Sequence, residues 1–300
     1  TKTVTGHALA KEQFEFKVKA VKTDTATADE AAELFGFKEG ETEVTFKNNE
    51  AAADGQTVTM LKTDTNFTLK NLGKVYKYEV SEMNDKKPGY TYDDTVYTVE
   101  LWVTDDGDGT LTLHTKVTDE KGSVISEETS NETDQKQTVL AFNNSYAGSG
   151  VLDGSANLAG TKKMDGPWEA TDKDLSGFRF TITGGDEATN AAITAGTVVL
   201  PQSVTATSDA DGNFNFGDIT FNEKGTYKFT VSEVVPAEGD KIPGVAYNAE
   251  TVTIIVNVTD NDDGTLTAAL AEGSQELIFT NTYATTQDAT FTPSVVKEVK

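Results

Sequence analysis

The chain contains an internal repeat. Residues 76–82 have the sequence YKYEVSE, and residues 227–233 have YKFTVSE. Four other patterns recur in the same order in both halves: K-x-x-x-G, P-G-x-x-Y-[DN], D-G-T-L and a closing F-x-N-x-Y. The copies are spaced by about 140–160 residues, which is the size of a domain and far longer than a solenoid repeat. The 300 residues are therefore expected to fold as two similar domains in tandem.

Apolar and polar residues alternate along several runs of both halves. The clearest runs lie at 14–18 and 96–103 in the first half, and at 178–182, 227–231 and 252–258 in the second. A period of two with Val, Thr, Tyr and Phe enriched is typical of half-buried β-strands. Gly-Asp and Asp-Gly clusters between the runs favour turns. The sequence therefore predicts an all-β chain of two tandem immunoglobulin-like (Greek-key) β-sandwich domains.

The repeat also sets the expected boundaries. Domain 1 covers residues 1–147, domain 2 covers 148–286, and 287–300 form a linker and the opening strand of a truncated third repeat. Residues 147–159 are rich in Gly, Ser and Ala and indicate a short linker or an opening strand. One Ala-rich segment, 29–37, predicts a short helix, and helical periodicity is otherwise nearly absent.

The charge and the residue types present exclude several functions. A formal net charge of −24 opposes binding to a phosphate backbone, so we expect no nucleic-acid partner. The sequence has no apolar run long enough to enter a membrane, which takes about 20 residues. With no cysteine and only two histidines, a disulfide framework, a thiol nucleophile and a multi-histidine metal centre are not expected. We expect no cofactor and no metal.

Acidic clusters at 105–108, 208–214 and 260–263 invite comparison with calcium loops. None of them has the full spacing of such a loop, which ends on a glutamate at its twelfth position. Turns between strands explain all three. A glycosidase uses a pair of carboxylates, but in a chain with 49 acidic residues such pairs do not indicate this activity.

The two tryptophans and the two histidines have different expected positions. Trp102 lies in an alternating run and is expected in the core or on the sheet surface, whereas Trp168 follows Pro167 in a loop and is the better candidate for a ligand contact. His7 and His114 are expected at exposed strand or turn positions.

Three residue types recur at matching places in the repeat. A lysine lies four residues before a glycine in the first strand, a glutamate ends the Y-x-[YF]-x-V-S-E strand, and an asparagine lies between the two aromatic residues of the last strand. The candidate sets are Lys2, Glu82 and Asn144 in domain 1, and Lys162, Glu233 and Asn281 in domain 2.

If these strands form one sandwich, all three side chains could point into its core. Burial disfavours charge, so it lowers the pKa of a lysine and raises that of a glutamate. A neutral amine is a nucleophile, and a protonated acid could polarise the asparagine carbonyl and shuttle protons. Attack on the side-chain amide with loss of ammonia would leave a Lys–Asn isopeptide bond, kept dry by Phe142 and Phe279. The alternative is a surface lysine, a surface glutamate and a turn asparagine.

The five patterns together resemble the streptococcal-type pilin isopeptide-linkage domain, over both copies and nearly the whole chain. The resemblance implies an immunoglobulin-like sandwich with an autocatalysed bond, Lys2–Asn144 assisted by Glu82 and Lys162–Asn281 assisted by Glu233. Lys163 follows Lys162, so the reactive lysine is inferred from its spacing to Gly166. By the same spacing Lys297 would serve an absent third domain.

The resemblance implies a structural stalk or shaft segment of a Gram-positive adhesin or pilin, which is not an enzyme with turnover. Such a protein is extracellular and anchored to the cell wall, and its partners are the adjacent repeats. We expect a monomer. Two alternatives remain. One is a module that binds a host protein or glycan through the divergent segments 24–56 and 184–212. The other is a polymerising pilus subunit, although no linking lysine stands out.

Overall fold

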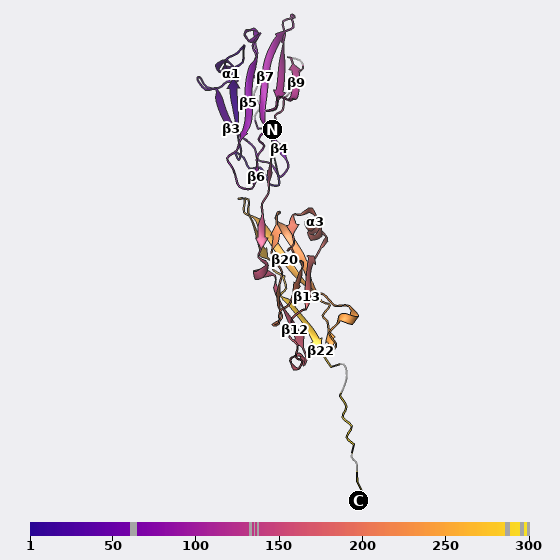
Figure 1. The fold of residues 1–300 in the computed structure, drawn as a ribbon. Coiled ribbons are helices and arrows are strands. Elements are labelled where there is room, and N and C mark those ends of the chain that lie inside the picture. The colour runs from indigo at the N-terminus through magenta and orange to yellow at the C-terminus, as the bar shows by residue number, and fades with distance from the viewer. Residues whose placement is uncertain are drawn as a thin grey trace. The chain divides into compact units, whose positions relative to one another are not determined.

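The computed structural model describes residues 1–60, 65–131, 134, 136, 138–285, 289–294 and 297–298. It divides into two compact units, Thr1–Ala147 and Gly148–Lys300. Each unit consists of β-strands with few short helices and has its own hydrophobic core (Figure 1). The predicted all-β fold of two tandem sandwich domains is confirmed.

The first unit is a sandwich of two sheets. A four-stranded sheet has the order β4-β1-β10-β6, and a six-stranded sheet has the order β3-β2-β5-β7-β8-β9. Its elements are β1 (Lys2–Thr5), β2 (Glu15–Val21), α1 (Ala28–Leu34), β3 (Glu43–Lys47), β4 (Thr57–Val58), η1 (Leu69–Asn71), β5 (Tyr76–Met83), β6 (Tyr90–Thr91), β7 (Val96–Asp105), β8 (Leu111–Thr118), β9 (Val124–Ser130) and β10 (Phe142–Tyr146).

The second unit repeats this plan and adds a small third sheet. The orders are β16-β12-β22-β19, β15-β13-β18-β20-β21 and β11-β17-β14. Its elements are β11 (Gly150–Leu152), α2 (Gly154–Asn157), β12 (Ala159–Asp165), η2 (Trp168–Ala170), β13 (Arg179–Gly184), α3 (Glu187–Ala195), β14 (Val198–Val199), β15 (Thr205–Thr207), β16 (Asn213–Asn215), β17 (Ile219–Phe221), β18 (Gly225–Glu233), η3 (Glu238–Asp240), β19 (Val245–Ala246), β20 (Thr251–Asp260), β21 (Leu266–Leu270) and β22 (Leu277–Tyr283).

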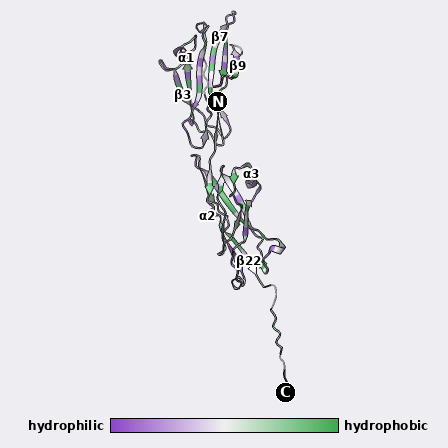
Figure 2. Ribbon diagram, in the orientation of Figure 1, coloured by the Kyte–Doolittle hydropathy of each residue, from purple (hydrophilic) through white to green (hydrophobic). Residues whose placement is uncertain are grey.

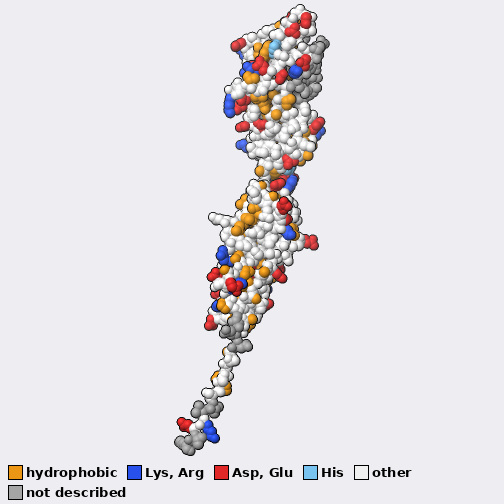
Figure 3. Space-filling view, turned by 90° about the vertical axis from the view of Figure 1, so that its right-hand side faces the viewer, with side chains coloured by type: hydrophobic (Ala, Val, Ile, Leu, Met, Phe, Trp, Pro, Cys, Tyr) orange, Lys and Arg blue, Asp and Glu red, His pale blue; other side chains and the backbone are white. Residues whose placement is uncertain are grey.

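The period-two runs produce the core because alternate side chains of a strand point to opposite faces. In β18 the side chains of Tyr227, Phe229 and Val231 are buried, and the residues between them are at least partly exposed. Hydrophobic and hydrophilic residues accordingly alternate along strands of both units (Figure 2). Acidic side chains are spread over the visible face of each unit and do not form one patch (Figure 3).

The two longest helices, α1 and α3, differ in how well the sequence predicts them. Helix α1 forms in the segment 29–37 that predicted it, and a capping box between Thr27 and Glu30 starts it. Helix α3 is not predicted. Its N-cap Asp186 accepts a hydrogen bond from the N–H of Thr189, and Gly196 ends it in the left-handed conformation at φ 78°.

The junction segment is ordered and packed. Its residues form β11 and α2, and β11 pairs with β17 of the same unit. A Cβ added to Gly150 would lie 2.2 Å from the carbonyl oxygen of Leu266, so the glycine allows a close backbone approach. Of the two interpretations of 147–159, the structure shows a strand, β11, followed by the short helix α2.

The expected opening strand of a third repeat falls on 287–300. The described residues there, 289–294 and 297–298, have no regular secondary structure, and the rest lie outside the described residues. No helix among the described residues is long and apolar enough to cross a membrane.

Candidate functional site

The first and last strands of each unit lie side by side and parallel. In unit 1, β1 pairs with β10, so that Lys2 lies opposite Phe142 and Val4 opposite Asn144. In unit 2, β12 pairs with β22 in the same register, with Lys162 opposite Phe279 and Met164 opposite Asn281. In each pair the lysine and the asparagine are two positions apart along the register. Side chains two positions apart share a face of the sheet, so both point into the core.

The glutamate comes from the facing sheet. Glu82 lies near the end of β5 opposite Phe16, and Glu233 ends β18 opposite Phe180. The three predicted residues of each unit therefore meet in the core from two sheets.

One carboxylate binds both partners. Nζ of Lys2 donates to Oε2 of Glu82 at 2.9 Å, and Nδ2 of Asn144 donates to Oε1 at 2.8 Å. The second unit has the same arrangement, with Lys162 to Oε2 of Glu233 at 2.9 Å and Asn281 to Oε1 at 2.7 Å. The loops around the two sites differ in sequence, so the agreement shows that the repeat preserves this geometry.

The site is dry and has aromatic walls. Lys2 and Lys162 have no exposed surface, and the side chains of both glutamates are fully buried. Nζ of Lys2 lies 4.7 Å from the ring centre of Phe14, and Nζ of Lys162 lies 4.9 Å from that of Phe178. These two phenylalanines were not predicted as site residues, although they belong to the alternating runs at 14–18 and 178–182.

The expected aromatic residues of the last strand are also buried. Phe142 and Phe279 are each 1% exposed. Phe142 packs on Phe16 at 5.2 Å between ring centres, and Phe279 packs on Phe180 at 5.0 Å. They help to exclude water from the lysine and the asparagine.

Burial disfavours the charged forms of both lysines and of Glu82. Desolvation lowers the pKa of Lys2 and of Lys162, and the glutamate beside each lysine only partly offsets it. Desolvation raises the pKa of Glu82, against the opposing effect of Lys2. In unit 1, proton transfer from Lys2 to Glu82 would give a neutral amine and a neutral acid at the place where both charged forms are costly.

The carbonyl oxygen of each asparagine has a donor that the sequence did not reveal. The backbone N–H of Asp93 donates to Oδ1 of Asn144 at 2.8 Å, and that of Asn248 donates to Oδ1 of Asn281 at 2.7 Å. Both residues occupy the last position of P-G-x-x-Y-[DN]. The glutamate therefore contacts the amide nitrogen, and the backbone N–H contacts the carbonyl oxygen.

The glycine of K-x-x-x-G has a structural reason. Gly6 and Gly166 have φ of 92° and 90°. A Cβ on either would lie 2.3 Å from the carbonyl oxygen of the last-strand tyrosine, Tyr146 or Tyr283. Only glycine allows the first strand to turn this close to the last one.

The other candidate residues lie elsewhere. Trp168 is 6% exposed and packs edge-on against Tyr283, so it is not available as the ligand contact that its loop position indicated. Trp102 is half-buried and stacks on His114 at 5.0 Å between ring centres. His7 is half-buried with its ring 4.8 Å from that of Tyr146. The two histidines are thus less exposed than expected.

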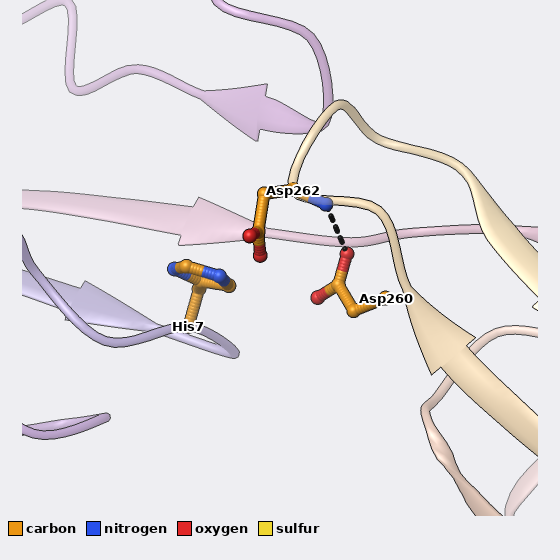
Figure 4. Close-up of side chains that lie close together, drawn as sticks. All are labelled: His7, Asp260 and Asp262. Carbon is orange, nitrogen blue, oxygen red and sulfur yellow. Dashed lines mark hydrogen bonds between the residues drawn. The ribbon is translucent and has the colours of Figure 1, made fainter.

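The acidic clusters form turns. In the β20–β21 connection the N–H of Asp262 donates to Oδ1 of Asp260 at 2.9 Å (Figure 4). In the β7–β8 connection the N–H of Gly107 donates to Oδ1 of Asp105 at 2.9 Å, and Asp209 accepts from the N–H of Asn213 at 2.8 Å. Their carboxylates fix the turn backbone, as the sequence predicted.

Comparison with known proteins gives one family. The family described as "Spy0128-like isopeptide containing domain" (FctA) matches residues 1–147 and 158–284. No match was found among curated protein sequences.

Solved structures similar to the chain include the major pilin from Streptococcus pyogenes, at 17% identity over 94% of this chain and 96% of that one, with a TM-score of 0.26. Another is GBS52, the minor pilin of Streptococcus agalactiae, at 12% identity over 98% and 88%, with a TM-score of 0.23.

Proposed function

The chain belongs to the FctA family of Spy0128-like isopeptide-containing domains, and from this premise we propose that each unit closes its own Lys–Asn isopeptide bond and serves as a stalk segment. The family is one of structural pilin domains of Gram-positive surface proteins. The proposed bonds are Lys2–Asn144 and Lys162–Asn281, with Glu82 and Glu233 as the assisting acids.

One observation carries the proposal. In both units a fully buried glutamate binds the lysine amine with one oxygen and the asparagine amide with the other. A buried charged pair contributes little net stability, so a purely structural role does not explain why the pair occurs in both copies. A reaction between the two groups that share the carboxyl does explain it.

The reaction balances without a cofactor or an oxidant. The neutral lysine Nζ attacks Cγ of the asparagine, a C–N bond forms, and the carbonyl electron pair moves onto Oδ1. When the pair returns, the Cγ–Nδ2 bond breaks. The glutamate takes a proton from Nζ and gives it to Nδ2, which leaves as ammonia. The carboxyl is regenerated, but the amide bond persists, so each site acts once.

The bond would tie the first strand to the last. It closes a loop of more than a hundred residues, for which loop entropy predicts a stabilisation of up to about 5 kcal/mol. Unlike a disulfide it cannot be reduced. Tension along the chain would pass through the bond and would not separate the strands. This suits a protein that holds another part of a surface assembly away from the cell wall.

The stalk role comes with an expected location and expected partners. We propose that the segment is extracellular, belongs to a protein anchored in the cell wall, and contacts adjacent repeats of that protein. A cluster of exposed aromatic residues on 24–56 or 184–212 would favour the binding-module alternative. Among the described residues of these segments, none of the strongly exposed large hydrophobic side chains is aromatic. No observation favours the alternative of a polymerising subunit.

Peptide mapping tests the proposal. After proteolysis, tandem mass spectrometry should find one branched peptide containing Lys2 and Asn144 and another containing Lys162 and Asn281. Asn281→Ala should remove only the second, whereas the control Asn257→Ala, at an exposed position of β20, should keep both. Linear peptides with free Lys162 and Asn281 in the unaltered protein would refute the bond in unit 2.

A further inference from the structure

The glutamate of each site contacts the nitrogen of the asparagine amide, and the carbonyl oxygen has a different donor. Oε1 of the glutamate accepts from Nδ2 of the asparagine in both units, at 2.8 Å and 2.7 Å. It therefore faces the nitrogen that leaves. Attack on an amide places negative charge on the carbonyl oxygen, and a donor aimed at this oxygen is the usual way to stabilise it.

We propose that the backbone N–H groups of Asp93 and Asn248 stabilise this oxyanion, and that the glutamate acts only as the proton carrier between Nζ and Nδ2. This assignment rests on the proposed isopeptide function. The donor distances to Oδ1 are 2.8 Å in unit 1 and 2.7 Å in unit 2. Each N–H already points to the atom on which charge develops.

The donor is the same in both units although the side chain differs. The residue is aspartate in unit 1 and asparagine in unit 2. What the two share is that Oδ1 accepts the N–H two residues on, from Thr95 at 3.1 Å and from Glu250 at 2.7 Å. Such a turn requires a short side chain with an acceptor, which Asp and Asn provide. The pattern [DN] is thus explained by backbone geometry.

The loop that carries the donor is fixed to the strand that carries the acceptor. Strand β6 pairs with β10, and β19 pairs with β22. The carbonyl oxygens of Gly89 and Gly244 accept the N–H groups of Ala147 and Ala284, each at 2.9 Å. These hydrogen bonds hold the donor beside the asparagine before the reaction, so little reorganisation is needed when charge develops.

The test replaces the donor in unit 2. Asn248→Pro removes the N–H together with the side-chain acceptor of the turn, and the matched control Asn248→Ala removes only that acceptor. Full-length chains made by cell-free synthesis are quenched in denaturant at intervals, and peptide mapping gives the linked fraction of each unit. We expect Asn248→Pro to slow linkage in unit 2 by roughly 100-fold or more, with unit 1 and the control unchanged. Linkage of a folded Asn248→Pro chain at the unaltered rate would overturn the assignment.

A second measurement needs no proline and uses the unaltered protein. Hydrogen exchange of the amide of Asn248 should be at least 100-fold slower than that of Ala249, because only the first N–H is held by the site. Equal exchange at the two positions would also overturn the assignment. If the unaltered chain forms no branched peptide at all, the isopeptide function itself fails, which is a different outcome from a linked chain that does not need this donor.

Discussion

A buried lysine is unstable in water-free surroundings unless something neutralises or consumes it. Lys2 and Lys162 are each fully buried against a phenylalanine ring and a glutamate. Conversion to an amide removes the charge and keeps the side chain in place. At the scale of single residues, the account therefore depends on whether the glutamate can move a proton.

The substitution Glu233→Gln tests this step. The glutamine side chain has nearly the same shape but cannot accept the proton from Nζ, so unit 2 should stay unlinked and lose up to about 5 kcal/mol of its free energy of unfolding. Mass spectrometry and thermal unfolding of unit 2 measure the two effects. The exposed control Glu250→Gln should leave both unchanged; complete linkage in Glu233→Gln would contradict the role of the acid.

The pKa shifts in unit 1 predict a pH dependence once the bond is blocked. In Asn144→Ala, folded Glu82 binds a proton more tightly than the unfolded chain does, so the unfolding free energy should fall as pH rises above its ordinary pKa of 4.5. Folded Lys2 binds its proton less tightly, so the free energy should rise again as pH approaches 10.5. The unfolding free energy of this variant should therefore have a minimum at intermediate pH.

Other groups of the acidic chain titrate as well, so the comparison must isolate this pair. The reference is the triple variant Lys2→Met, Glu82→Gln, Asn144→Ala, which lacks both titrating groups. Urea unfolding of unit 1 in both variants at several pH values gives the difference between their unfolding free energies. A difference that does not vary with pH would show that the pair is not shifted by burial.

The repeat in the sequence singles out the three residues that the structure brings together in each candidate site. The sequence could not reveal Phe14 and Phe178, whose places over the lysine depend on how two sheets pack. Nor could it reveal the N–H groups of Asp93 and Asn248, because a backbone donor has no residue type. The sequence indicates their position only through the last residue of P-G-x-x-Y-[DN], which is Asp in unit 1 and Asn in unit 2.

At the scale of elements, the parallel pairing of first and last strands sets the site geometry. The turn after the first strand must approach the last strand closely, and Gly166 makes this possible with φ 90° and a carbonyl oxygen 2.3 Å from where a Cβ would lie. The strand-forming runs were predictable from their period of two. Helix α3 was not, because its segment is rich in Ala and Thr and has little amphipathic pattern, and only its capping residues Asp186 and Gly196 indicate it.

Gly166 is not one of the three site residues, but its substitution by Ala should still disturb the geometry of the site in unit 2. We expect unit 2 to lose roughly 1–3 kcal/mol and to link more slowly, because the first strand must shift away from Tyr283. The matched control is Gly177→Ala, with φ 88° but no atom within 4 Å of the added Cβ. Chemical denaturation and linked fraction measure both variants, and equal effects on linkage would show that the close approach is not what matters.

At the scale of the whole molecule, the two bonds would determine which parts of the chain can be extended by tension. About 120 residues lie between Lys162 and Asn281, and fully extended they would span on the order of 400 Å. In single-molecule pulling, the linked unit 2 should release none of this length. Asn281→Ala should release it in one step, whereas Asn257→Ala should not. Release of this length from the unaltered unit would contradict a shaft role.

The composition also makes sense at this scale. The formal net charge of −24 is spread over both units, and the chain has no cysteine. Dispersed like charge favours solubility and opposes self-association. A Lys–Asn bond would provide the covalent closure that disulfides give to other extracellular domains, without depending on redox conditions.

The most direct test of the central claim is the intact mass of the unaltered 300-residue protein under denaturing conditions. Each isopeptide bond releases one ammonia, so two bonds should lower the mass by roughly 34 Da relative to the sequence. Asn144→Ala and Asn281→Ala should each remove one of the two losses of roughly 17 Da. A mass equal to that of the unmodified sequence would contradict the account.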